Sequence, residues 1–139
     1  MHMYKKILLA TDGSDNSYRA AEETLKLLHA DSEVMILNVF DASDSKDEVL
    51  HSGPSESIVR KRKEKLSKIE ALYRDNNVNY KVQFTQGIPN ETVVKFANNC
   101  TYDIVVLGSR GLNTLQEMML GSVSHKVTKR SNIPVLIVK

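Results

Sequence analysis

Three glycines and a serine near the C-terminus have a spacing that suits phosphate binding. Gly108 and Gly111 are separated by two residues, and nine further residues lead to the pair Gly121-Ser122, where a helical pattern begins. Glycine lacks a Cβ atom, so its backbone can turn sharply and approach a ligand closely. The first amides of a helix have no partner within the helix and carry roughly half a positive charge, which favours a phosphate group. The pattern therefore predicts a phosphate site that needs few lysines.

A second chemical group lies near the N-terminus, where Asp12 follows a short apolar run that ends at Ala10. Asp12, Gly13 and Ser14 are typical turn and helix-cap residues, so a purely structural role is one interpretation. The other is a carboxylate that binds a ligand. We assign Ser14 and Ser17 to the cap of the following helix, and we assign Asp12 to the site.

The elements that must position these groups alternate regularly along the chain. Apolar runs predict strands, and apolar residues at three- and four-residue spacing predict amphipathic helices between them. Five strands are expected at residues 5–10, 33–40, 78–84, 103–107 and 133–138, and four helices at about 14–28, 54–76, 90–100 and 121–130. Parallel neighbours need a long crossover, so this alternation predicts a parallel sheet with helices on both faces.

Strand character predicts the order of the sheet. Residues 7–10, 34–37 and 104–107 are unbroken apolar runs that suit central strands, whereas residues 78–84 alternate apolar and polar side chains as an edge strand does. The prediction is an α/β fold, a doubly wound open five-stranded parallel sheet of order 3-2-1-4-5 with four helices on both faces. This order leaves the apolar strand at 134–138 on an open edge. We expect a second copy of the chain to cover it, as a homodimer.

In such a sheet, ligands bind at the carboxyl ends of the strands, where the strand order reverses direction. That point lies between the first and fourth strands. The first ends at Ala10 and the fourth leads into Gly108, so Asp12 and the opening glycines are expected to face one another across one site.

Composition limits the other functions. The 139 residues suit one domain, 1–139, and 41% hydrophobic and 26% charged residues are ordinary globular values. The net charge of +2 and the spread of the basic run 60–68 around its helix argue against nucleic acid as a partner, and no run suits a membrane span. A single cysteine, Cys100, fits the reducing cytoplasm.

Together these residues resemble the universal stress protein family. The pattern Gly108-x2-Gly111-x9-Gly121-Ser122 is similar to the family's nucleotide-binding signature. Residues 6–14 (KILLATDGS) are similar to its first strand and acidic turn, and residues 134–138 (PVLIV) to its closing strand. The resemblance covers nearly the whole chain. It implies an ATP-binding universal stress protein, a nucleotide-dependent regulatory module of the stress response that binds ATP with magnesium.

The resemblance also implies roles for particular residues. Asp12 would serve the ribose or a magnesium ion bound to the nucleotide, the backbone of Val39 the edge of the adenine, and Gly108 through Ser122 the ribose and phosphates. The remaining members of the expected site are Ala10 at the end of the first strand, Arg110 as the nearest cation, Gly111, Gly121 and Val123. Residues 112–120 contain no lysine or arginine.

Other functions remain open at this stage. The chain has no Gly-x-Ser-x-Gly elbow, no Walker lysine motif and no evident general base, so at most a slow magnesium-dependent ATPase or nucleotide transferase is expected. A dimeric scaffold that works through protein contacts is a second alternative. A cyclic nucleotide is a narrower ligand for the same pocket. In the regulatory interpretation, ATP orders residues 109–122 and so changes the surface offered to an unidentified protein partner.

Overall fold

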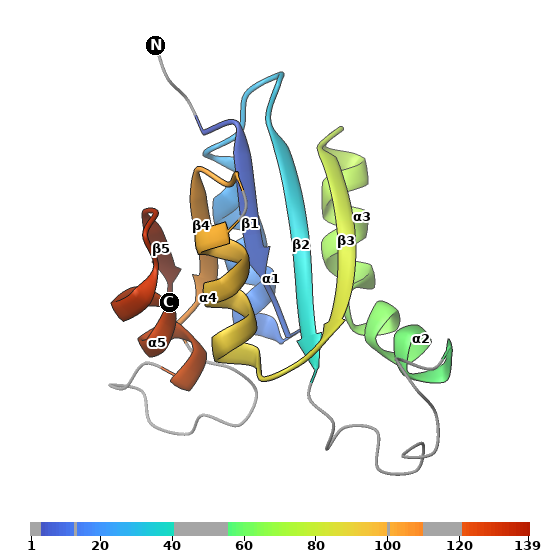
Figure 1. Ribbon diagram of the computed structural model, residues 1–139. Helices are drawn as coiled ribbons and strands as arrows, with labels where there is room; N and C mark the ends of the chain where they lie inside the picture. Colours follow the sequence, from blue (N-terminus) through green and yellow to red (C-terminus); the bar gives the residue numbers. More distant parts are fainter. Residues whose placement is uncertain (1–3, 13, 41–55, 100, 110–120) are drawn as a thin grey trace.

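The structure is a computed structural model that describes residues 4–12, 14–40, 56–99, 101–109 and 121–139. Five parallel strands form one sheet in the order β3-β2-β1-β4-β5, which confirms the predicted fold class (Figure 1). The strands are β1 (Lys6–Ala10), β2 (Glu33–Phe40), β3 (Asn79–Gln86), β4 (Ile104–Gly108) and β5 (Val135–Val138). The helices are α1 (Asp15–Leu25), α2 (Glu56–Lys65), α3 (Ser67–Asp75), α4 (Pro89–Asn99) and α5 (Ser122–Arg130).

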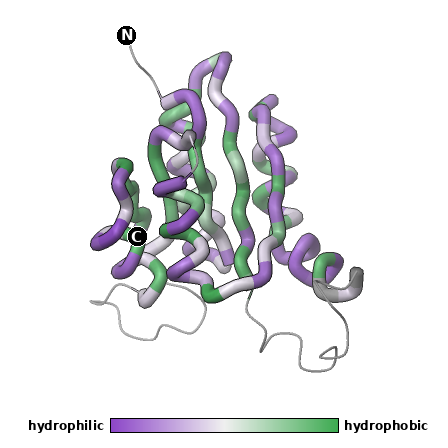
Figure 2. Tube along the Cα trace, viewed as in Figure 1, coloured by the Kyte–Doolittle hydropathy of each residue, from purple (hydrophilic) through white to green (hydrophobic). Residues whose placement is uncertain are grey.

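The centre of the sheet is the most hydrophobic part of the described chain, as Figure 2 shows. Every residue of β4 is buried, and so are the last four residues of β1, because helices cover both faces of these strands. By contrast, β3 alternates exposed and half-buried residues at its edge of the sheet. The predicted difference between central and edge strands is therefore confirmed.

The two faces of the sheet are covered by different helices. Ile7 and Leu9 of β1 pack with α1 and α3, whereas Leu8 and Ala10 pack with α4 and α5. Each fully buried aliphatic side chain stabilises the fold by about 1.5–3 kcal/mol, so a change of register in β1 would be costly. None of the helices among the described residues is both long and apolar enough to cross a membrane.

The helix expected over 54–76 is divided within its described residues, which makes five described helices where four were predicted. The break falls at Leu66, whose N–H is shared between the carbonyls of Arg62, at 3.2 Å, and Lys63, at 3.1 Å. This tighter turn separates a strongly charged α2 from α3, which packs against α1. Leu66 itself is fully buried in the core.

Candidate functional site

The acidic turn after β1 is held by the first turn of α1. Asp12 Oδ1 accepts hydrogen bonds from the Ser14 amide at 2.9 Å and from the Ser17 hydroxyl at 2.8 Å. Ser14 caps α1 as predicted, because its Oγ accepts the Ser17 amide at 3.2 Å. Ser17 is not the cap residue; its hydroxyl instead binds both Oδ1 and the backbone amide of Asp12. The Asp12 carboxylate therefore has a fixed orientation beside α1.

At the end of β4, Gly108 is needed for close packing against α1. A Cβ atom at this position would lie 2.1 Å from Oδ1 and 3.2 Å from the backbone oxygen of Asn16. From the sequence, the absence of a Cβ atom at Gly108 was expected to let the backbone come close to a ligand. In the structure, the group that approaches Gly108 closely is Asn16 in the first turn of α1.

The start of α5 is attached directly to the end of β4. The Gly121 amide donates to the Ser109 carbonyl at 2.7 Å, and the buried hydroxyl of Ser124 donates to the Gly108 carbonyl. Ser122, between these two anchors, has an exposed side chain, and Val123 is half-buried. The first turn of α5 is thus fixed in place at the carboxyl end of a central strand.

The first turn of α5 differs electrostatically from those of its neighbours. Helices α1, α3 and α4 each carry an acidic residue in the first turn, and α1 is also capped by Ser14. Helix α5 has no acidic residue in its first turn, and its N-cap, Gly121, provides no side-chain hydrogen bond. An anion at this end of α5 would meet the helix dipole with no acidic residue in the first turn of the helix.

A chain of contacts places the acidic turn and α5 at the same end of the sheet. Strands β1 and β4 pair side by side, with Leu9 opposite Val106. Asp12 accepts a hydrogen bond from Ser17 of α1, and Asn16, the residue before Ser17, packs on Gly108. The Gly108 carbonyl in turn accepts a hydrogen bond from Ser124 of α5. This is the point where the strand order reverses, which is where open parallel sheets bind their ligands.

Val39 lies near the end of β2, opposite Thr85 of β3. Because Ala10 pairs with Leu37, Val39 is two residues further along the neighbouring strand. Its half-buried side chain packs on the core face that α4 and α5 cover. The predicted adenine-binding residue is therefore at the same edge of the sheet as the acidic turn.

One residue at this edge was missed by sequence reasoning, which treated the basic run as a solvated surface. The Arg62 guanidinium donates to the side chain of Asn38 at 3.0 Å and lies 5.2 Å from the ring centroid of Phe40. A signal was available, because Arg62, Leu66 and Ile69 follow helical spacing and the latter two are buried. The prediction remains correct for the neighbouring cations Arg60, Lys61, Lys63 and Lys65, which are exposed.

Several expected site residues lie outside the described part of the chain, namely Gly13, Arg110, Gly111 and the loop 112–120. Cys100 also lies outside it. Within the described residues, no three or more histidine, cysteine, aspartate or glutamate side chains cluster as metal ligands. Asp12 is the carboxylate that the sequence prediction assigns to a magnesium ion.

Fold and site together define an α/β domain of the doubly wound type, in which the acidic turn and the start of α5 lie at the switch point. The model of the universal stress protein family matches residues 3–139. The chain therefore belongs to the universal stress protein family.

Individual relatives agree. The chain is 32% identical to universal stress protein MJ0531 of Methanocaldococcus jannaschii, over 99% of this chain and 84% of that protein. It is 35% identical to universal stress protein MJ0577 of the same organism, whose solved structure superposes with a TM-score of 0.85 over 99% of this chain and 97% of that chain. A universal stress protein solved in complex with cAMP is 25% identical, with a TM-score of 0.65 over 99% and 98% of the two chains.

Proposed function

We propose that residues 1–139 form a single domain that binds ATP, together with magnesium, at the carboxyl ends of β1 and β4. The observation that carries this proposal is the first turn of α5. It is anchored to β4 through Gly121 and Ser124, and it has neither a side-chain cap nor an acidic residue. The cAMP complex of a relative supports an adenine nucleotide as the class of ligand.

Each part of the nucleotide has a group of matching chemistry. The amides of Ser122 and Val123 and the Ser122 hydroxyl would donate to phosphate oxygens. Asp12, oriented by Ser14 and Ser17, would accept from a ribose hydroxyl or bind the magnesium ion that neutralises the phosphates. The backbone near Val39 would pair with the edge of the adenine. Ala10, Arg110, Gly111 and Gly121 complete the proposed site.

Calorimetric titration of the full chain with ATP and magnesium tests this assignment. Asp12→Asn keeps the size of the side chain and removes its charge, and Ser122→Ala removes one phosphate donor. We expect each variant to bind ATP about tenfold more weakly, which corresponds to about 1.4 kcal/mol. Unchanged ATP affinity in both variants would contradict the proposed site.

A cyclic adenine nucleotide is the second candidate ligand, and the cAMP-bound relative is the observation that favours it. One cyclic phosphate would occupy the same amides of α5 in place of three phosphates. Competition between cAMP and ATP for the chain decides between them. If ATP is the ligand, the concentration of ATP that displaces bound cAMP should be lower than the concentration of cAMP that displaces bound ATP.

We further propose that the nucleotide regulates contacts with a protein partner in the cytoplasm, with no dedicated catalysis. The described residues around Asp12 and Ser122 include hydrogen-bond donors and one carboxylate, which suit the binding of a nucleotide. We assign that carboxylate, Asp12, to the ribose or to magnesium, and we identify no other residue there as a general base. The alternative is a slow ATPase or nucleotide transferase. ADP release in proportion to added protein, and its loss in Asp12→Ala, would favour that alternative.

A homodimer through residues 134–138 is the third part of the proposal. The carbonyls of Pro134 and Val138 accept hydrogen bonds from β4, so the backbone groups of Val135 and Ile137 point to the open edge of the sheet. These groups would pair with the same strand of a second copy.

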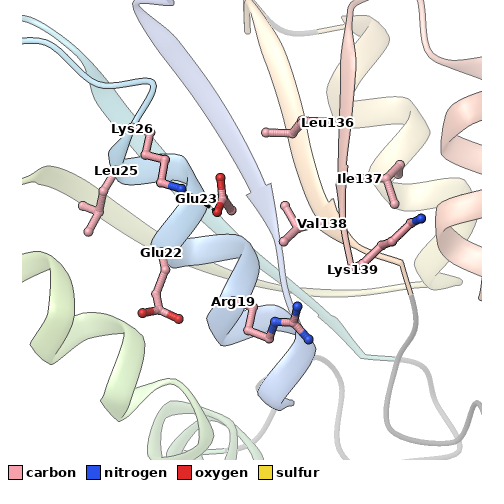
Figure 3. Close-up of a pocket in the computed structure, with 9 residues that line it drawn as sticks. All are labelled: Arg19, Glu22, Glu23, Leu25, Lys26, Leu136, Ile137, Val138 and Lys139. Carbon is pink, nitrogen blue, oxygen red and sulfur yellow. Dashed lines mark hydrogen bonds and ion pairs between the residues drawn. The ribbon is translucent and has the colours of Figure 1, made fainter.

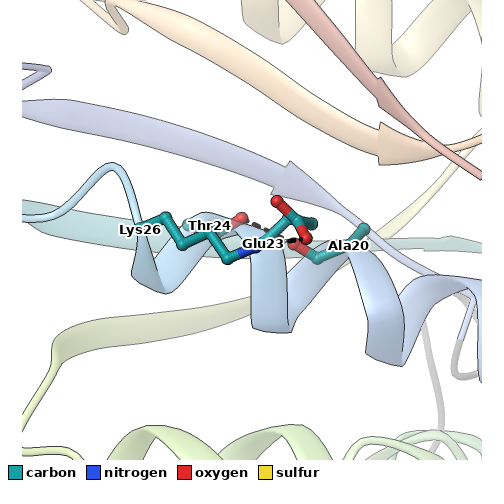
Figure 4. A network of polar contacts seen from close by, with 4 residues as sticks. All are labelled: Ala20, Glu23, Thr24 and Lys26. Atoms are coloured by element: carbon teal, nitrogen blue, oxygen red, sulfur yellow. Dashed lines mark hydrogen bonds and ion pairs between the residues drawn. The ribbon is translucent and has the colours of Figure 1, made fainter.

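An open groove beside this edge supports the dimer. It lies between α1 and β5 and shares no residue with the proposed nucleotide site (Figure 3). Its α1 wall carries both signs of charge, from Arg19, Glu22, Glu23 and Lys26. Glu23 and Lys26 form an exposed ion pair of 2.9 Å, which raises the pKa of Lys26 (Figure 4). A two-fold axis sets a patch against itself, and a patch of mixed sign is complementary to itself.

A further inference from the structure

The buried amide of Asn38 joins three elements at the carboxyl edge of the sheet. Its side chain is fully buried in β2. Nδ2 donates to the Thr11 carbonyl at 3.0 Å, just beyond β1, and Oδ1 accepts from Arg62 Nη1 of α2, also at 3.0 Å. Removing either contact would leave a buried polar atom without this partner, which destabilises the fold.

The chemistry of the two partners leaves this amide only one orientation. A backbone carbonyl accepts hydrogen bonds and cannot donate them, so the Asn38 NH₂ group must face Thr11. A guanidinium donates and cannot accept, so the oxygen must face Arg62. Arg62 and the Thr11 carbonyl therefore require the same orientation of the buried amide, and the amide links the Arg62 guanidinium to the Thr11 carbonyl.

Arg62 is placed for this contact more specifically than its neighbours on α2. It is half-buried, with its guanidinium 5.2 Å from the centroid of the Phe40 ring, within the range of a cation–π interaction. The guanidinium lies against this ring while one of its N–H groups donates to Asn38. Arg60 and Lys63 on the same helix are exposed.

The two residues that this contact fixes each precede a residue of the proposed site. Thr11 immediately precedes Asp12, and Asn38 immediately precedes Val39. We propose that Arg62 is a positioning residue of the nucleotide site. Through Asn38 it holds the two backbone segments that present Asp12 to the ribose and Val39 to the adenine, and it makes no contact with the phosphates. This inference rests on the proposed function.

Titration calorimetry of the full chain with adenosine, AMP and ATP tests the inference, the last two with magnesium. Arg62→Met keeps an unbranched stem over Phe40 and removes the donor and the charge. Because the contact acts on the ribose and adenine ends, we expect about tenfold weaker binding of all three ligands, by the same factor. Arg62→Lys keeps a charged donor and should recover part of the loss. Arg60→Met, which removes an exposed cation from the same helix, should bind all three as the wild type does.

The series separates positioning from other roles. A loss that grows from adenosine to ATP would mean that Arg62 contacts phosphate, and wild-type affinities in Arg62→Met would mean that it has no role in the site; either result overturns the inference and leaves ATP binding intact. A wild-type chain that binds none of the three ligands would overturn the proposed function as well.

A double-variant comparison tests the route through Asn38. In an Asn38→Ala background, Arg62→Met should cause little further loss of affinity, because its partner is already absent. A full additional tenfold loss would overturn the inference. Melting curves without ligand measure how much each variant destabilises the fold. The affinities for adenosine, AMP and ATP are then compared at a temperature at which every variant is folded.

Discussion

At the scale of single residues, the absence of a Cβ atom at Gly108 allows α1 to pack closely against β4. In Gly108→Ala, the new methyl group would meet the Asn16 side chain and lie 3.2 Å from its backbone oxygen. The side chain can rotate away, whereas the backbone oxygen moves only with α1. We expect the free energy of unfolding to fall by about 1–3 kcal/mol, measured by urea denaturation.

The control for this prediction is the same change in an Asn16→Ala background. Without the amide, the added methyl group meets only the backbone oxygen, so Gly108→Ala should cost less there than in the wild type. Equal costs in the two backgrounds would show that Asn16 does not determine the need for glycine.

Tyr73 provides a prediction on pH dependence. It is fully buried, its hydroxyl donates to the Ala21 carbonyl at 3.1 Å, and burial raises its pKa above the ordinary value of 10.0. The unfolded chain releases this proton near pH 10 while the folded chain keeps it. The contribution to stability is therefore full below that pH and declines as the pH rises further.

Tyr73→Phe should thus be less stable than the wild type by about 1 kcal/mol at neutral pH, because the hydrogen bond is lost. At about pH 10.5 the difference should shrink by roughly 0.8 kcal/mol. Urea denaturation of both proteins at the two pH values measures it. A difference that does not change with pH would mean that Tyr73 ionises equally in the folded and unfolded chains.

Individual side chains were the hardest part to predict from the sequence. The cap at Ser14 was predicted because its signal is local. The role of Ser17 depends on a bond back to Asp12, and that of Arg62 depends on a strand 24 residues earlier in the chain. Helical phase identifies Arg62 as inward-facing, but no local pattern shows that it meets Asn38.

At the scale of elements, the first turn of α5 contains one serine that attaches the helix to β4 and another that we propose to bind the nucleotide. Ser124 is buried and donates to the Gly108 carbonyl, whereas Ser122 is exposed. Ser124→Ala should lower the free energy of unfolding by about 1–3 kcal/mol. Ser122→Ala, the same chemical change two residues earlier, should alter stability by less than about 0.5 kcal/mol and weaken nucleotide binding.

Urea denaturation without ligand, followed by titration with ATP, measures both effects. A stability loss in Ser122→Ala and none in Ser124→Ala would contradict the assignment of Ser124 to stability and of Ser122 to nucleotide binding.

The elements themselves were largely predictable, since apolar periodicity reports burial directly. The unbroken runs in β1 and β4 and the alternation in β3 correctly indicated central and edge strands. The break at Leu66 was not predictable, because the apolar spacing continues through it. It arises from the shared hydrogen bond at the Leu66 amide.

At the scale of the whole molecule, the open edge at β5 predicts a specific dimer contact. Ile137→Pro removes an N–H that points to the open edge and leaves the bonds to β4 in place. Ile137→Ala removes most of the same side chain and keeps the N–H. If copies pair through this edge, sedimentation should show a much weaker dimer for the proline variant than for the alanine variant. Equal dimer strength in both would place the interface elsewhere.

The sheet order followed from the sequence because burial decides which strands are central, and that order is the reason for proposing a site at the switch point. The identity of the ligand does not follow in the same way. The amides of Ser122 and Val123 suit any phosphate. The groups that we propose to select the base are backbone groups near Val39, which no side-chain pattern encodes.

Thermal unfolding with and without magnesium-ATP at about 5 mM tests the central claim most directly, in the wild type and in Gly121→Glu and Gly121→Gln. Gly121 has φ −64°, which any residue adopts, so both side chains fit the N-cap backbone. We expect ATP to raise the melting temperature of the wild type by about 5 °C or more. Gly121→Glu should lose this shift because its carboxylate repels phosphate, and Gly121→Gln should keep more of it. Equal melting of the wild type with and without ATP, or an undiminished shift in Gly121→Glu, would contradict ATP binding at α5.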